Sequence, residues 1–254
     1  MSVPTRWPDL PHLSVHPLEP GWCITMHTAA PASPSDETTV DAAWREMLAA
    51  NDRLHDGQIM AVGVCDAAEL TIQCYPSTYR QLAVQHHPSV GDRGVRLLGV
   101  KARIFGVDRD NRGHVLIARR GTQTRVYGGM WEIGPGGGIE PLPNATAITH
   151  DDIVRSLIRE AQEEMGLKVA PADCRHVIAA ILDEWAYSVD LIMPVVWPGI
   201  VDPRRGLCAA DGCEWEYLDA AWIALDDWTD FAAKHASAIT PPTLAVARLQ
   251  QWGR

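Results

Sequence analysis

Residues 159–167 read Arg-Glu-Ala-Gln-Glu-Glu-Met-Gly-Leu, and this stretch decides the fold of the chain. Its three carboxylates, Glu160, Glu163 and Glu164, have the spacing that places side chains on one face of a helix. Like charges at that spacing repel one another, so a structural purpose alone explains them poorly. A hard divalent cation bound by oxygen ligands removes the repulsion, and the stretch therefore predicts a metal-binding helix face.

The ends of this helix can be predicted from its flanks. Thr149 can cap the first turn, and Asp152, three residues later, can complete a capping box. Apolar residues recur on the adjacent face and can anchor the helix to a core. Gly166 directly follows the last apolar residue of the pattern, as a C-terminal stop does. We expect a helix over about 150–165.

A glycine-rich segment, Gly136-Gly137-Gly138-Ile139-Glu140, precedes the acidic helix. Together with residues 159–167 it resembles the Nudix box, in which a glycine loop leads to a helix ending in Arg-Glu-apolar-X-Glu-Glu-X-Gly. The order of predicted elements over about 96–235 is also that of the Nudix fold. The resemblance implies an α/β fold, the Nudix α/β/α sandwich around a mixed sheet. For the charge run alone, a solvated acidic helix face is the alternative.

The resemblance also implies roles for individual residues. Glu160, Glu163 and Glu164 match the family's metal-binding glutamates, and Arg159 matches the arginine that pairs with them and holds them in place. Mg²⁺, with Mn²⁺ as a substitute, is the implied cofactor. Clustered carboxylates suit Mg²⁺, which can neutralise diphosphate oxygens and lower the pKa of bound water.

The front half of the box departs from the usual pattern. The segment between the glycines and Arg159 is eight residues longer than in the family's box. The position of the box's isolated glutamate holds Asp151. This shorter carboxylate is either an auxiliary ligand or simply a favourable charge at the start of the helix.

The chain divides near residue 95, after a polar, turn-forming stretch at 86–93. We expect residues 1–95 to form a smaller accessory α+β region and residues 96–254 to form the Nudix hydrolase domain. In the first part, the pattern predicts an irregular arm over 1–36 with one strand near 22–26, followed by helices and strands. The elements expected there and beyond are helices at 37–51, 75–85, 226–235 and 243–252, and strands at 58–65, 69–74, 95–107, 114–120, 127–133, 176–182, 188–197 and 214–223.

Composition limits the class of protein. The formal net charge of −10 argues against a non-specific nucleic-acid binder, which needs a basic surface. No apolar run approaches the roughly 20 residues of a membrane span, and the N-terminus lacks the apolar segment of a secretory signal. The six cysteines are scattered, as in a reducing compartment. We expect a cytoplasmic protein without a membrane or nucleic-acid partner, and the oligomeric state stays open, a homodimer included.

Several residues near the glycines can contact a substrate. Gly137 and Gly138 allow the backbone to approach phosphates closely. Arg120 can pair with phosphate oxygens, and Trp131 can stack on a base or a sugar. Arg119 and Arg125 are further phosphate candidates and Trp185 is a further stacking candidate; strand-end charges and core aromatics are the alternatives.

The general base is harder to place from the residues. Glu163 is the candidate within the box, so Glu163 and Arg159 are the predicted catalytic pair. Glu184, Glu214 and Glu216 are remote candidates, for which an exposed surface position is the alternative.

The substrate class is suggested by short sequence motifs outside the box. The segment 51–57 (Asn-Asp-Arg-Leu-His-Asp-Gly), then 78–80 (Thr-Tyr-Arg) and 98–100 (Leu-Gly-Val), resemble the UDP-glucose/UDP-galactose diphosphatase branch. That resemblance implies Mg²⁺-dependent hydrolysis of a nucleotide sugar to a nucleoside monophosphate and a sugar 1-phosphate. ADP-ribose and other nucleoside or prenyl diphosphates are the alternatives within the family. A ligand-sensing or scaffold protein is the non-enzymatic alternative, although such relatives usually lose box glutamates that this chain keeps.

Overall fold

The strands lie in one mixed sheet that extends across both predicted regions. The computed structural model describes residues 5–19, 21–27, 36–66, 71–142, 144–204 and 216–253. Within these ranges the sheet has 13 strands, with the main order β1-β2-β11-β12-β6-β4-β5-β3-β10. The strands are β1 Thr5–Trp7, β2 Leu10–Pro17, β3 Cys23–Met26, β4 Gln58–Asp66, β5 Thr71–Thr78, β6 Arg96–Val107, β7 Gly113–Arg120, β8 Trp131–Ile133, β9 Gly136–Gly138, β10 Ala147–Ile148, β11 Ala179–Asp183, β12 Ser188–Ile200 and β13 Tyr217–Ala224.

Helices cover both faces of the central strands. The helices are α1 Glu37–Ala50, α2 Tyr79–Ala83, α3 His150–Met165, α4 Trp228–Lys234 and α5 Pro241–Leu249. Leu116 and Ala118 of β7 belong to the core cluster beneath α3, whereas their neighbour Ile117 belongs to the cluster beneath α5. Successive strand residues point to opposite faces, so the sheet is packed on both sides. The predicted α/β/α sandwich with a mixed sheet and an additional N-terminal region is confirmed.

Helix α3 has the ends that its sequence predicts. The Thr149 side chain accepts from the Asp152 backbone N–H at 3.3 Å, and the Thr149 N–H donates to the Asp152 carboxylate at 2.9 Å. At the other end Gly166 adopts the left-handed conformation, with φ of 63°. Leu157 and Ala161 are buried on the core side. The capping box and the glycine stop fix the position of the acidic face along the helix.

The N-terminal region is built onto the same sheet. The predicted irregular arm is wrong for residues 10–17, because they form β2, which pairs with β11 over residues 13–17. Leu13 and Val15 are buried in the core, as alternate residues of a strand are. This apolar pattern is short and lies between prolines, so the sequence does not indicate a strand there. Further along, β4 pairs with β6. The division near residue 95 stays a prediction, but hydrogen bonds between strands cross it.

Two other predicted elements begin later than expected. The helix predicted over 75–85 starts at Tyr79, since β5 continues to Thr78 and Pro76 fits an extended segment better than a helix. The strand predicted over 127–133 starts at Trp131. Residues 121–130 are instead a loop between β7 and β8 that reaches the site described below.

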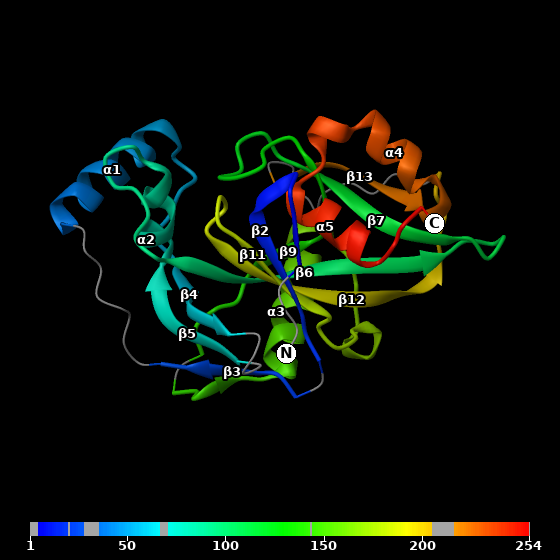
Figure 1. Ribbon diagram of the computed structural model, residues 1–254, viewed down its shortest axis with the longest axis horizontal. Helices are drawn as coiled ribbons and strands as arrows, with labels where there is room; N and C mark the ends of the chain where they lie inside the picture. The colour runs from blue at the N-terminus through cyan, green and yellow to red at the C-terminus, as the bar shows by residue number, and fades with distance from the viewer. Residues whose placement is uncertain are drawn as a thin grey trace.

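Helices α1 and α2 form their own layer at one end of the molecule (Figure 1). Val40 and Trp44 of α1 pack on Ala83, the last residue of α2, and on Val84, which follows it. Figure 1 shows this pair beside β4 and β5, while α4 and α5 lie at the other end over β7. No helix in the described ranges is long and apolar enough to cross a membrane.

Candidate active site

The site is built where the glycine strand β9 passes over helix α3. β9 pairs with β6 through Gly137 and Val100, which holds the glycines against the sheet. A Cβ added to Gly137 would lie 2.3 Å from the Glu160 Cδ atom, so only glycine leaves room for that carboxylate. The Gly136 N–H donates to the Glu164 Oε2 atom at 3.2 Å. The strand therefore positions Glu160 and Glu164, two of the three predicted metal ligands.

Arg159 binds three acidic side chains at the edge of this site. Its guanidinium donates to Glu160 at 2.7 Å and to Glu163 at 2.8 Å, and it lies 3.5 Å from Glu140. The Glu163 side chain is 56% exposed, whereas that of Glu160 is 12% exposed. Arg159 thus orients Glu160 inward and holds Glu163 at the surface.

The inner carboxylates are crowded and short of positive charge. Burial, partly offset by Arg159, raises the pKa of Glu160 to about 7. Burial, a hydrogen bond with Glu216 and the repulsion from Glu160 hold the pKa of Glu164 well above its usual range. Such a set of hard oxygen donors fits a divalent cation, whose charge would allow them to ionise together. In the described part of the chain, however, no three His, Cys, Asp or Glu side chains are already arranged around one point.

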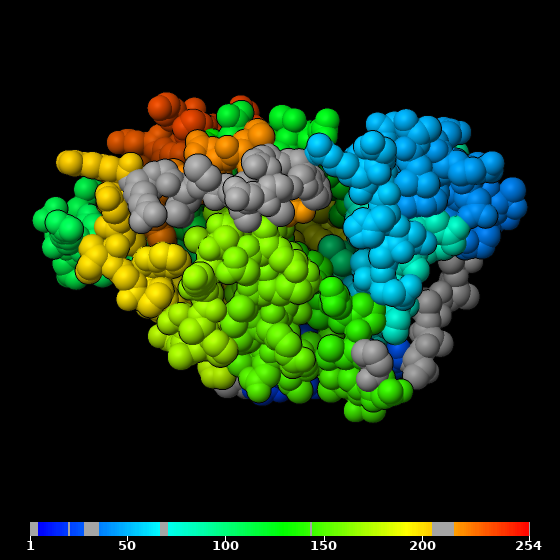
Figure 2. Space-filling model, turned by 180° about the vertical axis from the view of Figure 1, so that it is seen from behind, coloured from blue at the N-terminus to red at the C-terminus, as the bar shows by residue number. Residues whose placement is uncertain are grey.

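A cavity of about 380 Å³ opens beside these carboxylates. Glu164, Glu216, Gly136 and Gly137 line one end of it. The remaining walls come from the segment Asn51–Ile59, from Tyr79 and from the 121–130 loop, together with Leu97, Ala186, Ser188 and Asp190 of the sheet region. Figure 2 shows the surface hollowed where the blue N-terminal segment meets the green part of the chain. The volume is within the range of small-molecule sites.

The cavity is also lined by a buried charge cluster that sequence reasoning missed. Glu132 of β8 is 1% exposed and accepts from Lys101 at 2.7 Å, from Tyr217 at 3.0 Å and from Arg120. Burial opposes the ionisation of Glu132, but Arg120 and Lys101 outweigh it and lower its pKa to about 2. The four side chains come from four strands, β6, β7, β8 and β13. Within each strand a single charged residue is an ordinary feature, so no local signal marks the cluster.

The 121–130 loop brings a second set of polar side chains to the cavity wall. Arg125 donates to the Ala186 carbonyl at 2.9 Å, and no described carboxylate lies within ion-pair distance of it. Tyr127 has a left-handed backbone, with φ of 56°, and its hydroxyl donates at 2.6 Å to the fully buried Asp183. Left-handed backbone is uncommon for a tyrosine and is often retained at ligand sites. The 121–130 loop therefore presents a cation and an aromatic ring to the cavity.

The structure brings some predicted site residues together and separates others. Arg120, Gly137 and Glu216 line the cavity. Gly138, Trp131, Arg119, Glu163, Asp151, Trp185 and Glu184 do not line it. Trp131 packs on the rings of Phe231 and His235, with centroids 5.8 and 5.9 Å away. Glu214 lies outside the described residues.

Solved structures with a similar fold are distant in sequence. A NUDIX hydrolase from Alicyclobacillus acidocaldarius is 17% identical with a TM-score of 0.40, over 60% of this chain and 90% of its own. A MutT/nudix family protein from Enterococcus faecalis is 15% identical with a TM-score of 0.36, over 51% of this chain and 44% of its own. The NUDIX domain of Shewanella oneidensis NrtR, solved with ADP ribose, is 18% identical with a TM-score of 0.36, over 53% of this chain and 77% of its own.

The family assignment comes from the sequence itself. No curated protein matches the chain. The NUDIX domain family, however, matches residues 98–241, which is more than half of the chain and includes β9, α3 and the cavity end lined by Glu164 and Glu216. The chain therefore belongs to the Nudix hydrolase family, whose members act on pyrophosphate bonds.

Proposed function

We propose that the protein hydrolyses the diphosphate linkage of a nucleotide sugar resembling UDP-glucose, giving a nucleoside monophosphate and a sugar 1-phosphate. The observation that carries this proposal is a single cavity that is lined both by the carboxylates Glu164 and Glu216 and by aromatic and cationic side chains. A diphosphate with a group at each end has the chemistry to occupy both. Water supplies the oxygen that replaces the bridging oxygen on one phosphorus, so two monophosphates leave.

The acidic end is the proposed site of bond cleavage. We propose that Glu160, Glu163 and Glu164 hold Mg²⁺, for which Mn²⁺ can substitute. When bound, the ion neutralises diphosphate oxygens and lowers the pKa of a bound water. Arg159 keeps Glu160 turned inward through its hydrogen bond of 2.7 Å. Glu163, bound to the same guanidinium at the surface, stays the proposed base within the box.

The cationic side chains of the cavity differ in how far they are already paired. Lys101 and Arg120 both bind Glu132, so that carboxylate offsets part of their positive charge. Arg125 instead contacts the His86 ring and the Ala186 carbonyl, and it has no such partner among the described carboxylates. A guanidinium without a counter-ion in a partly enclosed site attracts phosphate. Arg125 is therefore the side chain proposed to pair with the diphosphate.

The wall from residues 51–59 supports a role for the N-terminal region, which we propose to be an accessory region over 1–95. It supplies Asn51, His55 and Gln58, whose polar side chains suit a sugar or a base. Tyr79 lines the same side. Retention of all three box glutamates and of Arg159 favours an enzyme over a ligand-sensing or scaffold protein.

A substrate panel tests this proposal. The protein is incubated with Mg²⁺ and UDP-sugars, ADP-sugars, ADP-ribose, dinucleoside polyphosphates and prenyl diphosphates, and the products are separated by chromatography. We expect UDP-glucose or UDP-galactose to give UMP and a hexose 1-phosphate with the highest kcat/KM. Preference for ADP-ribose or a prenyl diphosphate over every UDP-sugar would contradict the substrate assignment. Absence of turnover with every compound would contradict the enzymatic function.

A further inference from the structure

The cavity wall formed by residues 51–57 has no regular secondary structure of its own. Five of its residues line the cavity, including Asn51, Arg53 and His55. Its local bonds are few: Arg53 and Leu54 donate backbone N–H groups to Asn51. A segment of this kind keeps its position only through bonds to neighbouring elements.

In the part of the chain that the structure describes, the bonds of its last two residues, Asp56 and Gly57, go to the start of helix α2. The Tyr79 N–H donates to the Gly57 carbonyl at 2.8 Å. The Arg80 N–H donates to the Asp56 Oδ1 atom at 2.8 Å, and the Arg80 Nε atom lies 3.6 Å from the Asp56 Oδ2 atom. Tyr79 itself lines the cavity. The wall and α2 are therefore fastened at one point, next to the site.

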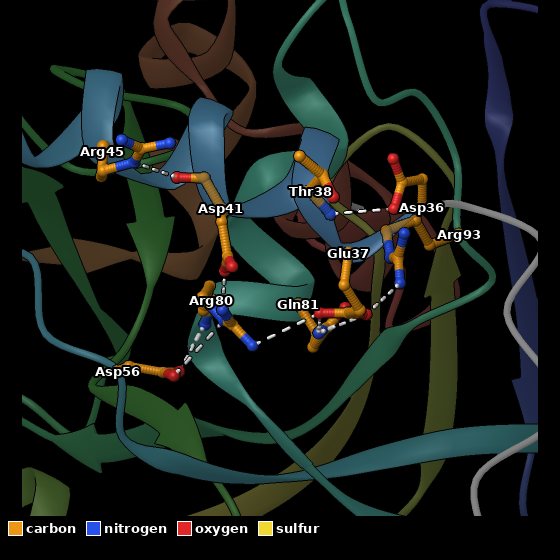
Figure 3. Close-up of polar contacts among 9 residues, drawn as sticks. All are labelled: Asp36, Glu37, Thr38, Asp41, Arg45, Asp56, Arg80, Gln81 and Arg93. Atoms are coloured by element: carbon orange, nitrogen blue, oxygen red, sulfur yellow. Dashed lines mark hydrogen bonds and ion pairs between the residues drawn. The ribbon is translucent and has the colours of Figure 1, made fainter.

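The same arginine is fastened to helix α1. Arg80 binds Asp41, and it lies 3.5 Å from Glu37. Glu37 in turn accepts from Arg93 at 3.2 Å and from Gln81 at 3.3 Å. Figure 3 shows Arg80 between Asp56 on one side and the acidic side chains of α1 on the other.

The arginines of this network are more buried than their carboxylate partners on α1, since Glu37 is 59% and Asp41 is 55% exposed. The Arg80 side chain is 27% exposed and that of Arg93 is 1% exposed. Arg80 faces three carboxylates from two separate parts of the chain. Its planar guanidinium has enough N–H donors to bind both parts at once, whereas an isolated ion pair links only two side chains. Networks with partly buried, multiply bonded arginines constrain geometry more than isolated exposed pairs do.

We propose that Arg80 is a positioning residue for substrate recognition, which holds the 51–57 wall against α1 and α2 at the distance the substrate requires. This role rests on the proposed function, because the wall recognises the part of the substrate beyond the diphosphate. Arg80 does not line the cavity, so it acts through Asp56 and the residues that follow it.

Hydrogen exchange and kinetics of Arg80→Ala test the proposal together. Without Arg80, amide exchange over 51–59 rises about tenfold, while exchange in β7 at the centre of the sheet is unchanged. KM for the preferred substrate rises about tenfold and kcat changes by less than about twofold, as expected when binding is lost equally in the ground and transition states. Arg80→Lys keeps the charge without the fork and gives intermediate values.

Arg45→Ala is the matched control, because among the described residues the Arg45 Nε atom donates only to the Asp41 carbonyl of its own helix. It leaves exchange and KM at wild-type values. Asp56→Asn keeps the acceptor for the Arg80 N–H but removes the charge, so the rises in exchange and in KM should be smaller than in Arg80→Ala. This variant replaces Arg80→Ala in the test if Arg80→Ala does not fold.

Three outcomes would overturn the positioning role. They are unchanged exchange over 51–59 in both variants, an equal rise in β7, and a fall in kcat with KM unchanged. Exchange is measured without substrate, so it decides the positioning of the wall even if no compound in the panel is hydrolysed, a result that would refute the proposed function alone.

Discussion

The three glycines of β9 should respond differently to alanine, and Gly137→Ala tests the site most specifically. A Cβ at 137 would lie 2.3 Å from the Glu160 Cδ atom and 2.4 Å from its Oε1 atom. These atoms are the end of a flexible side chain, so Glu160 can move aside without moving the backbone. At 138 a Cβ would lie 3.2 Å from the Leu97 Cδ1 atom, which can also give way. At 136 a Cβ would lie 2.6 Å from the Val100 carbonyl oxygen, a backbone atom that cannot give way.

The expected magnitudes follow from these contacts. Gly137→Ala stabilises the fold by about 0.4–1 kcal/mol, because alanine lowers the conformational entropy of the unfolded chain. It also loses the Arg159–Glu160 contact, which is worth about 0–1 kcal/mol. The free energy of unfolding should therefore stay within about 1 kcal/mol of wild type. A displacement of the Glu160 carboxylate by about 1 Å costs about 100-fold in kcat. Gly136→Ala must widen the β9–β6 spacing and destabilises by about 1–3 kcal/mol.

Urea unfolding and steady-state hydrolysis of the preferred panel substrate measure both quantities. We expect Gly137→Ala to fold normally and to lose activity, and Gly138→Ala to keep both stability and activity. Full kcat in Gly137→Ala would refute the reasoning that the glycine exists to admit Glu160. An equal loss of kcat in Gly138→Ala would show that strand geometry, and not the carboxylate, is the sensitive feature.

Two further predictions concern residues beside the site. Glu132→Gln leaves Lys101 and Arg120 buried without their counter-ion and should lower the unfolding free energy by about 3 kcal/mol at pH 7, measured by urea unfolding. Because the folded-state pKa of Glu132 is lowered to about 2, below the ordinary value of 4.5, the ionised side chain stabilises the fold above pH 4.5. The difference between wild type and variant should therefore shrink as the pH falls from 5 to 3, and a constant difference would contradict the ion-pair account. Trp131→Ala should lower the unfolding free energy by about 2 kcal/mol through lost ring packing on Phe231 and His235, with KM unchanged; a large rise in KM would instead place Trp131 against the substrate.

The acidic helix and its capping residues could be predicted because their signals are local. Thr149, Asp152 and Gly166 lie within one helix and its two ends, and the structure uses each of them as expected. The inward turn of Glu160 and the outward turn of Glu163 could not be predicted, because they depend on Gly137 from another element and on which carboxylates Arg159 reaches.

The cavity itself is a product of tertiary structure. Asp56 and Arg80 lie 24 positions apart in sequence, and Lys101 and Glu132 lie 31 apart. Neither pair leaves a periodic or motif signal, since the two partners of each pair lie in separate segments of the chain. The strand at 10–17 was equally obscure, because tertiary pairing with β11 overrides a proline-rich sequence.

The central claim, that the end of the cavity lined by Glu164 is where a diphosphate is hydrolysed, is tested most directly by Glu164→Gln. The substitution keeps the shape of the side chain and removes a buried carboxylate that is costly to ionise, so folding should be unaffected. The measurement is the rate of product formation from UDP-glucose and the other panel compounds with Mg²⁺, for wild type and variant at matched folded concentration. We predict turnover by the wild type and a loss of about 100-fold or more in kcat for the variant. Equal rates in the two proteins would contradict the account.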